Sequence, residues 1–310
     1  RPNQSARSAY RTMPHRQADD SDTVKIKGPL GIIAGGGPLP CVLADAAASR
    51  GLELHIVGIR GEAREEIERF PHTWMKWGEV GKLFSALNDK GCRDLVIIGG
   101  VARPDLANVK FDLGAIRNLP FLVSLGMGGG DDHVLSSIVR FLEGKGYRVH
   151  GAGDVAPELL AGQGRLGDRA PSADDKADIA MGFNVVGALG RLDVGQAAVV
   201  VKGHVLAVEA AEGTDAMLAR CAELRESRRT RRHARAGVLV KAPKPGQEER
   251  VDLPTIGPET VRKAAAAGLA GIAIAAGQVL MAERAATIEA ANENGLFLVG
   301  ETLASSADSA

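Results

Sequence analysis

One carboxylate in a proline-rich loop is the feature of this chain best suited to chemistry. The loop, residues 241–257, reads KAPKPGQEERVDLPTIG and follows a short apolar run, 237–240, that has the pattern of a buried strand. Asp252 lies between Val251 and Leu253, so it is an acid in an apolar setting. Loops that leave a strand often carry catalytic groups, although a lone aspartate is more often a solvated residue at a helix entry. Asp252 therefore needs support from elsewhere in the chain.

Two glycine-rich turns could bind an anion. Residues 35–37 follow an apolar strand expected at 30–34, and residues 99–100 follow one expected at 94–98. Backbone N–H groups at a helix N-terminus favour phosphate, and the carboxyl ends of parallel strands share one sheet edge. Arg103 could bind a phosphate oxygen there, or lie at the surface before a proline. A tight turn without a ligand explains the first motif about as well.

The first turn is a poor dinucleotide-binding fingerprint. After Gly35 and Gly37, Pro40 stands where a third glycine is expected, and the strand at 52–59 has no acid at its end to hold a ribose hydroxyl. Arg60 follows that strand and would suit the additional phosphate of NADP. An NADP-linked oxidoreductase therefore stays open as an alternative.

Adjacent carboxylates follow a third glycine run. Asp131 and Asp132 come directly after the glycines at 128–130. Paired acids suit a hard divalent cation that also binds phosphate oxygens. The simpler role for one of them is to cap the helix that follows.

Thr214 and Lys202 belong to a predicted strand-turn-strand-helix unit. Strands expected at 197–201 and 205–209 form a hairpin, with Lys202 just before its turn. Thr214 follows an acidic turn and could cap the helix expected within 210–224. Both residues could also face a ligand.

Composition excludes several classes of function. Lys plus Arg and Asp plus Glu each number 38, and aromatic residues make up 4%, so nucleic-acid binding is disfavoured. The three cysteines form no CxxC pair, which indicates reduced thiols of a cytosolic protein. No apolar run of about 18 residues is present, so no membrane-spanning helix is expected. The basic run 225–235 is a solvated face or suits an anionic membrane surface.

Strands and helices alternate over short connections, which predicts parallel sheets covered on both faces. The fold class expected is α/β with two domains and a ligand cleft between them. Residues 28–155 form a Rossmann-like N-terminal domain, 156–172 a linker rich in Gly, Ala and Pro, and 173–303 a C-terminal α/β catalytic domain. We expect 1–27 to be a disordered extension without a secretory signal, and 304–310 a tail.

Six sequence blocks, taken together and in order, resemble the LpxI-type UDP-2,3-diacylglucosamine pyrophosphatases. The blocks are GGGPLP, GGVARPDL, GGGDDHVL, DVGQAAVVVKGHVLAVEAAEGTDAML, GVLVKAPKPGQEERVDLPTIGPETV and AGLAGIAIAAGQVLM. The resemblance covers about 30–300 and implies a Gram-negative enzyme of lipid A biosynthesis. It implies hydrolysis of UDP-2,3-diacylglucosamine to 2,3-diacylglucosamine 1-phosphate (lipid X) and UMP, with water attacking the sugar-side phosphorus. The essential aspartate of the DLPTIG block is Asp252 here.

The resemblance and the residues together define the expected site. Asp252 is expected to be catalytic and to bind Mg²⁺, or another divalent cation such as Mn²⁺, with Asp131 and Asp132 as further ligands. Expected substrate- or phosphate-binding residues are Gly35, Gly36, Gly37, Gly100, Arg103, Lys202, Thr214, Lys244, Gln247 and Thr255. The diacylated substrate implies peripheral contact with the inner face of the cytoplasmic membrane. A non-catalytic module that binds a nucleotide sugar or a lipid remains the other alternative.

Overall fold

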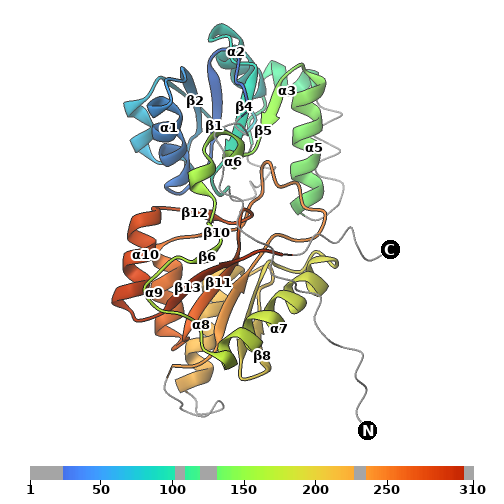
Figure 1. The fold of residues 1–310 in the computed structure, drawn as a ribbon. Helices are drawn as coiled ribbons and strands as arrows, with labels where there is room; N and C mark the ends of the chain where they lie inside the picture. The colour runs from blue at the N-terminus through green and yellow to red at the C-terminus, as the bar shows by residue number, and fades with distance from the viewer. Residues whose placement is uncertain (1–23, 102–108, 119–130, 227–234, 304–310) are drawn as a thin grey trace. The chain divides into compact units, whose positions relative to one another are not determined.

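The computed structural model describes residues 24–101, 109–118, 131–226 and 235–303, which fall into two compact units (Figure 1). The first unit holds Asp20–Leu159 together with Gly246–Leu253. The second holds Leu160–Pro245 and the residues from Pro254 onward. Within the described residues the chain therefore passes from one unit to the other three times, and the short segment that carries Asp252 belongs to the first unit.

The first unit is built on a five-stranded parallel sheet with the strand order β3-β2-β1-β4-β5. The strands are β1 (Leu30–Ala34), β2 (Leu54–Ile59), β3 (His72–Met75), β4 (Asp94–Ile98) and β5 (Arg148–His150). The helices are α1 (Leu39–Ser49), η2 (Glu65–Arg69), α2 (Val80–Asp89), α3 (Leu113–Arg117), α5 (Asp131–Gly144), α6 (Ala152–Val155) and η4 (Pro157–Leu159). The order of strands reverses between β1 and β4, and such switch points are where open parallel sheets bind ligands.

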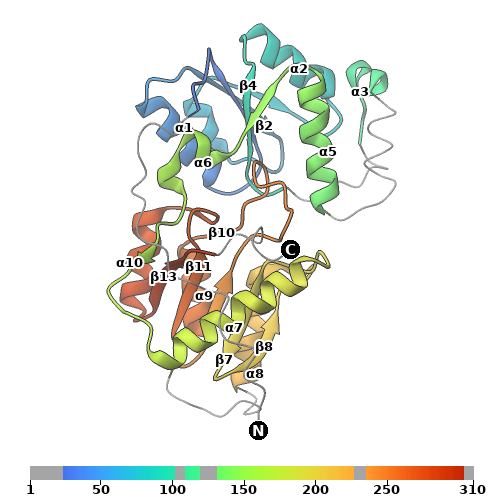
Figure 2. The same ribbon diagram turned by 45° about the vertical axis from the view of Figure 1, so that its right-hand side comes forward.

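Helices cover the central strands of this sheet, which are mostly apolar. Every residue of β1 and β2 is buried, as expected for parallel strands with both faces covered. On one face Phe84 of α2 contacts Phe141 of α5 and Tyr147, with 5.9 Å between ring centroids in each pair. Figure 2 shows α1 and α6 side by side, away from α5.

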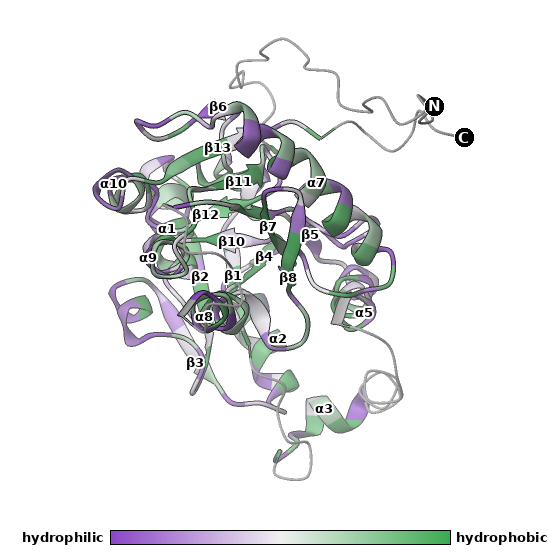
Figure 3. Cartoon of the chain, turned by 90° about the horizontal axis from the view of Figure 1, so that it is seen from below, coloured by the Kyte–Doolittle hydropathy of each residue, from purple (hydrophilic) through white to green (hydrophobic). Residues whose placement is uncertain are grey.

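The second unit has a mixed six-stranded sheet in the order β6-β13-β11-β9-β7-β8. The strands are β6 (Gly164–Arg165), β7 (Ala197–Val201), β8 (His204–Val208), β9 (Val238–Lys241), β11 (Gly271–Ala275) and β13 (Phe297–Glu301). In this sheet β11 pairs in parallel with β9 and β13, and the pairings of β6 with β13, β7 with β9 and β7 with β8 are antiparallel. A separate parallel pair is formed by β10 (Thr255–Ile256) and β12 (Leu280–Met281). The helices are α7 (Ala173–Gly190), α8 (Gly213–Glu226), α9 (Pro258–Ala266) and α10 (Arg284–Glu293). Figure 3 shows β7 and β11 in the green of apolar residues, which fits their place in the core.

The expected α/β fold with two domains is confirmed, and the differences are local. The strands expected at 30–34, 94–98 and 197–201 are β1, β4 and β7, and β5 was not predicted because it is only three residues long. The expected linker 156–172 contains η4 and β6, and the units divide between Leu159 and Leu160. No helix in the described ranges is long and apolar enough to cross a bilayer.

Candidate active site

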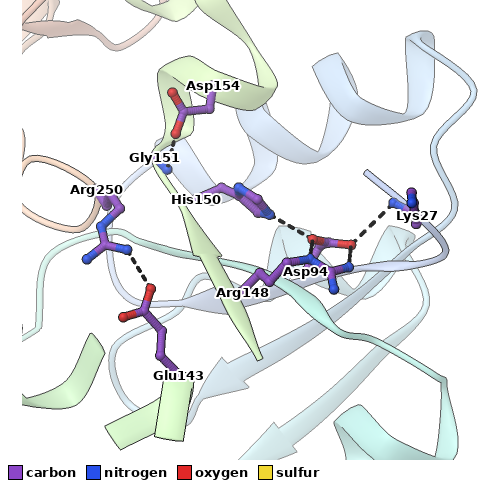
Figure 4. Close-up of polar contacts among 8 residues, drawn as sticks. All are labelled: Lys27, Asp94, Glu143, Arg148, His150, Gly151, Asp154 and Arg250. Carbon is purple, nitrogen blue, oxygen red and sulfur yellow. Dashed lines mark hydrogen bonds and ion pairs between the residues drawn. The ribbon is translucent and has the colours of Figure 1, made fainter. Parts of the chain in front are cut away.

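Two adjacent residues, Arg250 and Val251, attach the segment Gly246–Leu253 to the rest of the first unit. Val251 packs against the apolar core of that unit. Arg250 donates to Glu143 of α5 at 2.6 Å (Figure 4) and, through two further nitrogens, to both carboxylate oxygens of Glu248 at 2.7 and 2.8 Å. These hydrogen bonds from Arg250 hold the pKa of Glu248 below its ordinary value. Asp252 therefore directly follows two residues, Arg250 and Val251, whose side chains are held by contacts within the first unit.

Asp252 is held in a tight turn by its own neighbours. Its backbone N–H and that of Val251 both donate to the carbonyl of Glu248 at 3.1 Å. The buried Gln247 directs its Nε2 to the Asp252 carbonyl at 2.5 Å and to one oxygen of the Asp252 carboxylate. Binding of substrate by Gln247 stays a prediction; in the structure its amide nitrogen bonds to Asp252. This arrangement fixes the direction of the half-buried carboxylate.

The chain that leaves Asp252 is fixed within the second unit. Leu280 donates to the Pro254 carbonyl at 2.8 Å, and Ala282 donates to the Ile256 carbonyl at 2.9 Å. The carbonyl of Thr255 accepts from Lys241 Nζ at 3.0 Å. Pro258 is the first residue of α9, as the sequence predicts.

Lys241 lies in a buried polar cluster that sequence reasoning missed. Its ammonium donates to the hydroxyl of Thr214 at 2.8 Å, and that hydroxyl donates to Glu209 at 2.7 Å. All three side chains are buried. The Thr214 hydroxyl thus joins the buried Lys241 ammonium to the buried Glu209 carboxylate, and binding of phosphate by Thr214 stays a prediction. The feature of the sequence that could have indicated this cluster is Lys241 itself, a charged residue that directly follows the apolar residues of the strand.

The two lysines expected to bind phosphate, Lys202 and Lys244, each make contacts within the protein. Lys202 and Gly203 form the two-residue turn between β7 and β8 with φ of 51° and 76°, and their N–H groups donate to the buried Asp178 at 2.8 and 2.7 Å. Lys244 pairs with Asp193 at 2.5 Å. Binding of phosphate by either lysine stays a prediction.

The two glycine turns of the first unit lie against each other at the switch point of its sheet. Gly36 and Gly100 exchange N–H···O bonds of 2.6 and 3.1 Å, and Gly35 donates to Ile98 at 2.9 Å. The N–H groups of Gly35, Gly36 and Gly100 are thus bonded within the protein. Phosphate binding at these three amides, and at the neighbouring Gly37, stays a prediction.

Gly35→Ala should destabilise the first unit by about 2 to 3 kcal/mol, whereas Gly100→Ala should cost less than about 1 kcal/mol. A Cβ on Gly35 would lie 2.7 Å from the carbonyl oxygens of Gly99 and Gly100, but one on Gly100 meets nothing within 4 Å. Urea unfolding followed by tryptophan fluorescence measures this, since both tryptophans, Trp74 and Trp77, belong to the first unit. Equal effects of the two substitutions would contradict the close contact of the turns.

The described residues contain no cluster of three His, Cys, Asp or Glu side chains able to hold a metal. Asp131 and Asp132 are the first two residues of α5, but their side chains lie outside the described part, and so does Arg103 entirely. Mg²⁺ is often bound by one or two carboxylates together with substrate phosphates and water. Asp252 fits that mode. Its carboxylate is half-buried and oriented by Gln247, and it belongs to no group of three ligating side chains among the described residues.

A second charged cluster lies at the amino ends of β4 and β5. Asp94, 1% exposed, accepts from Arg148 at 2.7 and 2.6 Å and contacts His150 Nε2 at 2.7 Å (Figure 4). The backbone N–H of Lys27 adds a bond of 3.3 Å. Because β4 runs from Asp94 toward Gly99, this cluster is at the opposite sheet edge from the glycine turns. We assign it a structural role.

Comparisons with known proteins match both units of the chain to one family. The model of the LpxI N-terminal domain matches residues 29–159, and the model of the LpxI C-terminal domain matches 162–299. The chain is 45% identical over 271 residues to the UDP-2,3-diacylglucosamine pyrophosphatase LpxI of Caulobacter vibrioides. That alignment covers 87% of this chain and 96% of the relative. The junction between the two matched domains coincides with the Leu159–Leu160 crossing between the units.

Proposed function

Because this chain belongs to the LpxI family, we propose that it hydrolyses the pyrophosphate of UDP-2,3-diacylglucosamine in lipid A biosynthesis. The products are 2,3-diacylglucosamine 1-phosphate and UMP. The observation that carries the proposal is the 45% identity to a named pyrophosphatase over 96% of that relative's length. The family resemblance found in the sequence is confirmed, and it favours a hydrolase over the oxidoreductase and the binding module.

Asp252 is the residue we place at the reaction centre. Its carboxylate would hold Mg²⁺ or Mn²⁺ jointly with the substrate phosphates, and Asp131 and Asp132 are proposed as further ligands. The cation, when bound, would neutralise charge that develops on the phosphoryl oxygens. The structural support is the local geometry: Gln247 and the Glu248 carbonyl hold Asp252 in one orientation before the substrate arrives. Such preorganisation avoids a reorganisation cost during the reaction.

Gln247→Leu should weaken Mg²⁺ activation by about 10- to 100-fold, because the carboxylate loses the donor that orients it. The measurement is hydrolysis rate against Mg²⁺ concentration, compared between Gln247→Leu and wild type. Gln247→Glu keeps the length of the side chain but offers no amide donor, so it should not restore activation. Unchanged Mg²⁺ dependence in both variants would show that Gln247 does not position Asp252.

Release of UMP from detergent-dispersed UDP-2,3-diacylglucosamine tests the function. We expect release with Mg²⁺, loss of release in EDTA and recovery when Mg²⁺ is restored. Turnover that persists in EDTA would contradict the metal dependence but leave the hydrolase proposal standing. Binding of a reduced dinucleotide, seen by its fluorescence, would instead favour the oxidoreductase.

The substrate carries two acyl chains, so the enzyme must meet it at a lipid surface. We propose peripheral contact with the inner face of the cytoplasmic membrane. The absence of a spanning helix among the described residues is compatible with such contact.

A further inference from the structure

Helix α3 presents apolar side chains to solvent in an arrangement that core packing does not explain. Leu113 is 76% exposed, Ile116 55% and the preceding Phe111 41%. Leu113 and Ile116 are three residues apart, so they share one side of the helix. Ala115 is the buried residue of this helix. Single exposed apolar residues are ordinary, but three within six positions form a patch.

The first unit holds this short helix firmly rather than leaving it loose. The Asp112 carboxylate accepts from Ala115 N–H of α3 at 2.7 Å and from the Gly81 and Lys82 N–H groups of α2 at 3.1 and 3.2 Å. One side chain thus caps both helices. The helices also meet backbone to backbone, since a Cβ on Gly114 would lie 2.3 Å from Gly81 Cα. The exposed residues are therefore displayed on a fixed support.

Basic residues border the patch. Lys110 precedes Phe111, and Arg117 follows Ile116; both are exposed, and within the described ranges neither has an assigned ion pair. The one acid of the stretch, Asp112, is engaged by three amide donors. Apolar side chains flanked by Lys and Arg are the composition that enters the interface of an anionic bilayer.

We propose that Phe111, Leu113 and Ile116 form a membrane-docking patch that inserts into an anionic lipid surface. The choice of a bilayer as occupant rests on the proposed function, since a diacylated substrate resides in one, and on the basic rim supplied by Lys110 and Arg117. The patch belongs to the same unit as the Asp252 segment. Docking through it would bring that unit to the surface that contains the substrate.

Co-sedimentation with vesicles of phosphatidylglycerol and phosphatidylethanolamine, without substrate, tests the proposal. Leu113→Gln with Ile116→Gln should lower the partition coefficient about tenfold, because two apolar side chains no longer leave water. Leu192→Gln is the control, because Leu192 is 73% exposed in the second unit and no other described large apolar residue within ten positions of it in the sequence is exposed. It should leave partitioning unchanged. Equal binding of all three proteins would overturn the proposal.

Further arms separate the remaining outcomes. Lys110→Gln with Arg117→Gln should weaken binding to anionic vesicles and not to neutral ones; equal losses on both would overturn the role of the basic rim.

If the Leu113 and Ile116 substitutions change the oligomeric state in analytical ultracentrifugation but not vesicle binding, the patch is a self-association surface and the proposal is wrong. The variant with Leu113→Gln and Ile116→Gln should hydrolyse detergent-dispersed substrate at the wild-type rate. Failure of wild type in that assay would count against the proposed function and not against docking.

Discussion

Asp252→Asn is expected to lower kcat for UDP-2,3-diacylglucosamine hydrolysis by about 10³-fold, which corresponds to about 4 kcal/mol of transition-state stabilisation. Asparagine keeps the size of the side chain and one carbonyl oxygen, so the turn held by the Glu248 carbonyl should remain. The variant loses the negative charge needed to hold a divalent cation next to anionic phosphates. UMP release under saturating substrate is the measurement.

Glu249→Gln provides the matched control for Asp252→Asn. Glu249 is an exposed acid in the same segment, so its substitution removes the same charge with little expected effect on kcat. Titration of Mg²⁺ then separates two roles of Asp252. If Asp252→Asn loses turnover but binds Mg²⁺ with unchanged affinity, the carboxylate is not a metal ligand and acts as a base. If the variant keeps most of its activity, the reaction centre lies elsewhere.

Asp94→Asn is expected to destabilise the first unit by about 3 kcal/mol at neutral pH, since it breaks a buried charge network. Burial alone would raise the pKa of Asp94, but hydrogen bonds from Arg148 and His150 bring it below its ordinary value. A carboxyl group with a lowered pKa in the folded state stabilises the protein above the pKa of the unfolded chain. That stability disappears as pH falls through the lowered folded-state pKa.

Urea unfolding followed by tryptophan fluorescence at several pH values measures the effect of Asp94→Asn. The difference in unfolding free energy between wild type and variant should shrink below about pH 4, as Asp94 of the wild type becomes protonated. Asp89→Asn, at an exposed position at the end of α2, should stay within about 0.5 kcal/mol of wild type. A difference for Asp94→Asn that is independent of pH would contradict the role of its charge.

Strand positions were predictable where apolar runs are uninterrupted and glycines end them. The strands β1, β4 and β7 lie where the sequence places them, because burial on both faces demands continuous apolar residues. The sequence also predicts that the two glycine turns lie at one sheet edge, since strands of a parallel sheet end together, and the structure adds that they contact each other. Short strands such as β5 and β6 carry too few residues to show a pattern.

The surroundings of Asp252 were not predictable in the same way. The DLPTIG block identifies the residue through its resemblance, but the membership of Gly246–Leu253 in the first unit depends on contacts of Val251 and Arg250 with distant residues. The bond from Gln247 to Asp252 depends on the turn that brings positions five apart together. The pairing of Lys241 with Thr214 spans 27 residues and depends on the sheet of the second unit.

The most direct measurement of the central claim is hydrolysis of UDP-2,3-diacylglucosamine by the wild-type chain in water labelled with oxygen-18. The products are separated, and the oxygen-18 content of each is measured by mass spectrometry. The account predicts Mg²⁺-dependent release of unlabelled UMP, with the heavy oxygen in 2,3-diacylglucosamine 1-phosphate, because water attacks the sugar-side phosphorus. Label in UMP would contradict that point of attack. No UMP from folded protein with Mg²⁺ or Mn²⁺ would contradict the assignment of this chain as a pyrophosphatase.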